Sequence, residues 1–105
     1  MRRHIYGYML AHEGRSEEEI TNDELLLFRW AQVEGYFLAA IYQEVDEGSI
    51  AELTELVGEL RNTGDGAVVV PSVEHFGTHA LLQEHLWAYV VHTADAEVHE
   101  AVSRK

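Results

Sequence analysis

Acidic, histidine and hydroxyl side chains follow directly after a short valine-rich run in this 105-residue chain. Ala67–Val70 is apolar at every position, which is typical of a strand buried on both faces. Pro71 ends that strand because it has no N–H to donate to a neighbour. Ligands and substrates of open α/β sheets bind beyond the carboxyl ends of such strands, so the polar turn after Pro71 is the first candidate site. Its side chains capable of chemistry are Glu74, His75, Thr78 and His79.

A further histidine, His12, follows the first predicted strand and is next to Glu13. Because parallel strands end at one edge of a sheet, we expect His12, His75 and His79 to converge there. Imidazoles beside carboxylates could hold a metal or a small anion, or His12 could act as a nucleophile or general base. The alternative is that these histidines make only local hydrogen bonds, because His75 and His79 straddle Gly77 and need not share a helical face.

Hydrophobic periodicity predicts strands that alternate with helices. The expected strands are Arg3–Leu10, Tyr36–Val45, Ala67–Val70 and Ala96–Val102. The first helix has two possible capping boxes, Ser16 with Glu19 and Thr21 with Glu24, and an apolar stripe of Leu26, Leu27, Trp30, Ala31 and Val33 ending at Gly35. The second helix is expected from a third box, Ser49 with Glu52, to Asn62–Gly64, and the third over Leu81–Val90 with a break at Thr93–Asp95.

This order predicts one α/β domain over residues 1–105, in which helices cover both faces of a mainly parallel four-stranded sheet. No glycine-rich loop follows the first strand, which argues against dinucleotide-binding and P-loop proteins. No cofactor is expected.

The charge of the chain limits its partners. Nineteen acids against seven Lys and Arg give a formal net charge of −12, and the basic residues cluster only at Arg2–Arg3 and Arg104–Lys105. Proteins that bind nucleic acids draw most of their affinity from cations that neutralise phosphates, so direct binding is not expected. The acidity suits solubility, or a face for a basic partner.

The absence of cysteine excludes disulfides and thiolate chemistry. The apolar runs are too short to span a bilayer, and the polar and glycine residues at His4, Gly7 and Tyr8 argue against a signal peptide. We expect a cytoplasmic protein that does not associate with membranes.

Three stretches, in order, resemble the catalytic domain of serine recombinases of the resolvase/invertase type. Tyr8–His12 (YMLAH) stands where the family has Tyr-x-Arg-Val-Ser, and Glu34–Phe37 (EGYF) matches its glycine and aromatic strand. Glu74–Thr78 (EHFGT) matches Asp-Arg-Leu-Gly-Arg. The resemblance extends from about Ile5 to Val102, and the chain also resembles small stand-alone resolvase-like proteins of actinobacteria.

The departures from the family pattern imply a degenerate site with no catalytic residue. His12 replaces the serine that attacks DNA, and Leu10 replaces an arginine. Glu74 and His75 replace the Asp-Arg pair, and Thr78 replaces the last arginine. Phosphoryl transfer needs fixed positive charge around the phosphate oxygens, so strand cleavage by the family mechanism is not expected. The family's C-terminal DNA-binding region is expected to be missing as well.

The sequence thus favours a non-catalytic resolvase-like domain that acts through protein contacts, as a self-associating or regulatory protein. Phe28 and Trp87 lie off the apolar helical stripes and would suggest an interface if they are exposed. One alternative is a small histidine-based enzyme or a metal- or anion-binding protein in the old cleft. Another is a DNA-linked regulator that reaches DNA through a basic partner.

Overall fold

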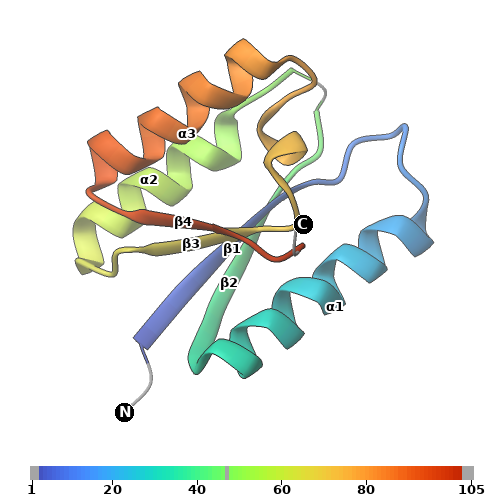
Figure 1. Ribbon diagram of the computed structural model, residues 1–105. Coiled ribbons are helices and arrows are strands. Elements are labelled where there is room, and N and C mark those ends of the chain that lie inside the picture. Colours follow the sequence, from blue (N-terminus) through green and yellow to red (C-terminus); the bar gives the residue numbers. More distant parts are fainter. Residues whose placement is uncertain (1–2, 47, 103–105) are drawn as a thin grey trace.

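The computed structural model describes residues 3–46 and 48–102, in which strands and helices alternate (Figure 1). The strands are β1 (Arg3–Leu10), β2 (Tyr36–Glu44), β3 (Ala67–Val70) and β4 (Glu97–Glu100). The helices are α1 (Glu17–Glu34), α2 (Ala51–Thr63), α3 (Ala80–Ala94) and the short 3-10 helix η1 (Val73–Phe76).

The four strands form one parallel sheet in the order β2-β1-β3-β4. Helix α1 covers one face, while α2 and α3 lie side by side on the other (Figure 1). The expected fold class, a three-layer α/β domain with helices on both faces, is therefore confirmed. All four strands end at the edge where the polar turns gather.

Each face of the sheet has its own hydrophobic core. Alternate residues of β1 point to opposite faces, so Tyr6 and Tyr8 pack under α2 and α3, whereas Ile5 and Met9 pack under α1. The central strand β3 is fully buried on both faces, as its unbroken apolar run predicts.

Helix α1 begins at the first of its two possible capping boxes. Ser16 accepts a hydrogen bond from the Glu19 N–H, and the Glu19 side chain accepts from the Ser16 N–H. Thr21 therefore lies inside the helix. At the other end, Gly35 adopts φ 82°, the left-handed conformation expected of the residue that closes this helix. The predicted apolar stripe is wrong at Val33, which is 82% exposed because it lies on the side of the helix away from Leu27.

The third predicted capping box does not form. Helix α2 has Ile50 at its N-cap without a side-chain bond, and Glu44 at the end of β2 takes over that role. The buried Glu44 carboxylate accepts from the N–H groups of Glu52 and Leu53 at 3.2 and 3.0 Å. An acid from the preceding strand thus satisfies the helix start, which local spacing does not reveal.

A glycine brings α1 close to the centre of the sheet. A Cβ atom at Gly7 in β1 would lie 2.9 Å from a Leu27 methyl carbon and 3.2 Å from Ile41. Glycine at this position therefore allows helix and strand to approach more closely than any side chain would permit.

The last strand, Glu97–Glu100, is shorter than predicted, because its neighbour β3 ends at Val70, before Pro71. Backbone N–H groups of Ala101 and Val102 still donate to Val70 and Pro71, but the chain bends there. The basic residues Arg2, Arg104 and Lys105 lie outside the described residues. Within the described ranges, no helix has both the length and the apolar character needed to cross a membrane.

Candidate functional site

A cavity of about 220 Å³ lies at the carboxyl edge of the sheet, between the ends of β1, β2 and β3. We call it the edge cavity. Its described lining is Tyr8, Leu10, His12, Asp46, Gly48, Ser49, Ile50, His75, Phe76, Gly77, Thr78, Leu82 and Leu86. The stacked rings of Tyr8 and Phe76, 5.7 Å apart, form part of it. Four of the five positions taken from the family pattern therefore meet here: Leu10, His12, His75 and Thr78.

His75 is buried and tied to the end of β1. Its Nδ1 accepts the backbone N–H of Leu10 at 2.9 Å, so the proton of the neutral ring lies on Nε2. Nε2 in turn lies 3.4 Å from the Asp23 carboxylate of α1. Burial lowers the pKa of His75 more than the Asp23 charge raises it. The imidazole is thus held neutral, as a structural link between η1, β1 and α1.

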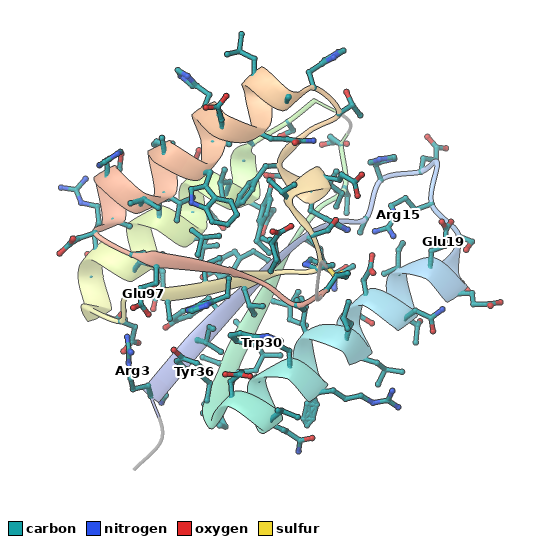
Figure 2. The ribbon with its side chains drawn as sticks, in the orientation of Figure 1. Arg3, Arg15, Glu19, Trp30, Tyr36 and Glu97 are labelled. Carbon is teal, nitrogen blue, oxygen red and sulfur yellow. The ribbon has the colours of Figure 1, made fainter. Side chains whose placement is uncertain are left out.

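Arg15 closes this link into a ring of hydrogen bonds and charges. Figure 2 shows Arg15 in the loop before α1, and its guanidinium binds Asp23 at 2.5 Å and the Leu10 carbonyl at 2.6 Å. Both backbone polar groups of Leu10 are therefore occupied, one by His75 and one by Arg15. This network, Leu10-His75-Asp23-Arg15, is called the edge ring below.

The positive charge of Arg15 is already bound within the edge ring. Arg15 is engaged by a carboxylate and a carbonyl, and His75 is neutral. The described lining of the cavity contains no lysine or arginine and does contain Asp46. A phosphate entering this cavity would meet the Asp46 carboxylate and no lysine or arginine among the described lining residues.

His12 lines the cavity but makes only a local contact. Its Nδ1 accepts the Gly14 N–H at 3.3 Å, and its side chain is partly exposed. Thr78 is exposed at the mouth. Two other predicted site residues lie outside: Glu74 is exposed and accepts from the Ser72 hydroxyl at 3.2 Å, and His79 is exposed at the start of α3.

The three histidines proposed for a metal do not meet. His12 and His75 share the edge cavity, whereas His79 does not line it. Across residues 3–46 and 48–102, no group of three or more His, Asp or Glu side chains is arranged to hold a metal ion.

Arg15, Asp23 and Glu44 were not predicted. Glu44 could have been found, because it is an acid at the carboxyl end of a strand, where polar residues of such sheets gather. Asp23 and Arg15 are eight residues apart and meet only because the loop folds back beside α1, which no spacing rule indicates.

A second polar cluster lies at the opposite edge, where the strands begin. Figure 2 shows Trp30 of α1 near Tyr36 of β2, with Arg3 and Glu97 beside them. The Trp30 and Tyr36 rings stack at 5.8 Å, and Arg3 lies over the Tyr36 ring at 5.6 Å. Arg3 and Glu97 form an exposed ion pair at 3.8 Å. The Trp30–Tyr36 stack fastens the start of β2 to α1, and the Arg3–Glu97 pair joins the starts of β1 and β4.

No protein-family model matches this chain, and no curated protein is significantly similar to it in sequence. Solved structures do match. The N-terminal catalytic domain of TP901-1 integrase is 13% identical with a TM-score of 0.74, covering 94% of this chain and 77% of that one. The C-terminal catalytic domain of ISC1926 TnpA, an IS607-like serine recombinase, is 10% identical with a TM-score of 0.76, covering 97% of this chain and 69% of that one.

The chain has a serine recombinase catalytic-domain fold. The resemblance expected from Tyr8–His12, Glu34–Phe37 and Glu74–Thr78 is confirmed at the level of the fold. At this identity the similarity describes architecture, and the chemistry has to be argued from the residues of this chain.

Proposed function

We propose that this chain is a non-catalytic domain of recombinase-like fold that acts through protein contacts. The observation that carries the proposal is the edge ring, which links Arg15, Asp23, His75 and Leu10 to one another. Groups at the edge where chemistry would take place serve to hold β1, η1 and α1 together.

The physical argument concerns charge. Transfer of a phosphoryl group requires cations or N–H donors directed at oxygens that gain negative charge. The Leu10 N–H is already donated to His75, and Arg15 already binds Asp23. Freeing either group would break the ring and leave a buried partner without its hydrogen bond, at a cost of about 1–3 kcal/mol.

The surface supports the second half of the proposal. Large apolar side chains are exposed on α1, β2 and α3: Leu25, Phe28, Val33, Phe37, Leu81 and Leu82. Phe28, predicted as an interface residue, is 44% exposed, whereas Trp87 is half-buried against Phe76. Phe28 of α1 and Phe37 of β2 border one hollow, and exposed apolar side chains gathered in this way mark surfaces where soluble proteins contact partners.

Sedimentation equilibrium and an electrophoretic shift assay test this function. The proposal predicts no shift of duplex DNA at low salt, because a chain of charge −12 repels the phosphates, and the dependence of the mass on concentration shows whether the protein partner is a second copy. A saturable shift by the protein alone would contradict the proposal. A shift only with an added basic protein would favour the DNA-linked regulator.

One observation favours a second candidate, a histidine-based binding site. His12 and His75 line the same cavity, together with Ser49 and Thr78. Calorimetric titration with zinc, nickel and manganese, and with inorganic phosphate, tests it. Heat that vanishes in a His12→Ala variant would support this candidate, and no heat with any of the four would remove it.

A further inference from the structure

Helix α3 is apolar around most of its circumference. Leu86, Val90 and Ala94 face the core, while Leu81 is 78% exposed and Leu82 44% exposed. A helix with apolar residues on all sides is normally covered on all sides. In the described structure, the sheet, α2 and η1 cover α3 on its inner side and along one flank, and leave its outer side open.

A groove of about 560 Å³ runs along the outer side of α3. We call it the α3 groove; its lining is Val73, Ala80, Gln83, Glu84, Trp87, Ala88, Val91 and His92. Most of these residues recur at helical spacing, so the groove follows the helix for more than three turns. The small side chain of Ala88 lies at its middle and would let another helix approach closely.

The low negative charge of α3 favours a second copy of this chain as the partner in the α3 groove. Helix α1 carries six acids and α2 carries three, whereas α3 carries only Glu84, with His85 and His92. A strongly acidic chain can meet a second copy of itself only where acids are few, and α3 is the least acidic helix. A basic partner would be drawn to α1 instead.

The sequence of α3 is also self-complementary. Glu84 and His92 each lie four residues from Ala88, on opposite sides. Two α3 helices packed antiparallel about a two-fold axis at Ala88 place each Glu84 against the His92 of the other copy, so that an imidazole N–H donates to a carboxylate twice. Neither Glu84 nor His92 forms a salt bridge with any other described residue.

We propose that the α3 groove is the contact through which two copies of this chain pair, with their α3 helices antiparallel and Ala88 at the two-fold axis. This inference rests on the proposed function and specifies its partner. A helix of 15 residues is about 22 Å long, so the interface is small. We expect a reversible dimer with a dissociation constant on the order of 10–100 µM.

The test measures dissociation constants by sedimentation equilibrium for the native chain and five variants. Ala88→Glu places two carboxylates at the axis and should weaken pairing about tenfold or more. Glu84→Lys and His92→Glu should each weaken it several-fold, and the double variant should restore it, because the introduced ammonium group then faces the introduced carboxylate. Phe37→Glu is the matched control, since it adds the same charge at an exposed apolar site on β2.

Each outcome decides the inference. The inference is supported if Ala88→Glu weakens pairing, Phe37→Glu leaves the dissociation constant unchanged and the double variant pairs as the native chain does. Circular dichroism verifies that all variants fold. Weaker pairing in Phe37→Glu with none in Ala88→Glu would move the contact to β2 and overturn the inference, while the proposed function would stand. A native chain that stays monomeric to about 1 mM, well above the expected dissociation constant, would also overturn it. The proposed function fails on a separate measurement, a saturable shift or cleavage of DNA by the protein alone.

Discussion

At the scale of residues, His75 makes structural contacts at the edge cavity. Its ring is buried, accepts the Leu10 N–H and faces Asp23, and burial lowers its pKa. A histidine whose folded pKa lies below its unfolded value stabilises the fold fully above the unfolded pKa, which is about 6.5. That stabilisation is lost as the pH falls below 6.5, because the unfolded chain then binds the proton more readily.

The first prediction follows from the lowered pKa of His75 and the loss of stability that it causes below pH 6.5. Replacing the ring by His75→Asn, which keeps an acceptor for the Leu10 N–H and cannot be protonated, should reduce the loss of unfolding free energy between pH 7 and pH 5. The reduction is bounded by about 1.4 kcal/mol per pH unit for one proton. Urea unfolding at several pH values measures it, with exposed His79→Asn as the control. Equal pH slopes in the native chain and His75→Asn would contradict it.

Glu44 gives the second prediction. Its carboxylate accepts two N–H groups of α2 and the Tyr8 hydroxyl at 3.1 Å. Glu44→Gln keeps the size but turns a donor toward those donors, and should lower the unfolding free energy by about 1–3 kcal/mol. Tyr8→Phe is the matched variant, and should cost about 1 kcal/mol, because the carboxylate still caps α2.

The contact between Tyr8 and Glu44 also predicts how the unfolding free energy changes above pH 10. Burial, and then the Glu44 charge, raise the pKa of Tyr8 above its ordinary value of 10.0. Because the folded state holds this proton more tightly, the stabilisation is complete below pH 10 and is lost as the pH rises further. Tyr8→Phe should show a smaller loss of stability above pH 10 than the native chain. An identical alkaline transition in both would rule out this role for Tyr8.

At the scale of elements, the start of α1 offers a matched comparison. Ser16 and Thr21 both begin a capping-box pattern, but only Ser16 accepts the hydrogen bond. Ser16→Ala should therefore lower the unfolding free energy by about 1 kcal/mol. Thr21→Ala should leave the unfolding free energy within about 0.5 kcal/mol of the native value, because Thr21 lies past the first turn of the helix with its side chain in solvent. Chemical denaturation compares them, and equal losses would mean that the helix starts elsewhere.

The contact between α1 and β1 depends on Gly7. Because an added Cβ would lie 2.9 Å from a Leu27 carbon, Gly7→Ala should force the helix outward and cost about 1–3 kcal/mol. Gly58→Ala, in α2, is the control: nothing lies within 4 Å of its Cβ position, and alanine favours the helix. Thermal unfolding measures both, and a neutral Gly7→Ala would contradict the packing argument.

At the scale of the whole molecule, the periodic features of the sequence predict the architecture and the contacts between distant residues do not follow from them. The valine run predicts the central buried strand, Gly35 predicts the end of α1, and strand-helix alternation predicts the parallel sheet. The edge ring joins residues up to 65 positions apart, so no local spacing announces it. Local spacing also fails at the start of α2. The Glu52 N–H donates to Glu44 of β2 instead of to the predicted cap Ser49, because the acceptor comes from another element.

The edge cavity was predicted in part. Strand ends that meet at one edge bring His12, His75 and Thr78 together, as expected from the fold. His79 is expected at the same edge because it follows the same strand, but the turn through Gly77 carries it to the exposed start of α3. What the cavity can bind depends on Arg15 and Asp23, whose pairing required the folded loop.

The most direct test of the account is an attempt to trap the chain on DNA. The purified protein is incubated with end-labelled duplex and supercoiled plasmid at low salt, and the products are denatured and separated to detect covalent adducts and nicks. We predict neither, because the resemblance places His12 where the family has its attacking serine, and because Arg15 is bound within the edge ring. A labelled polypeptide that survives denaturation, or plasmid relaxation that increases with protein concentration, would contradict the account.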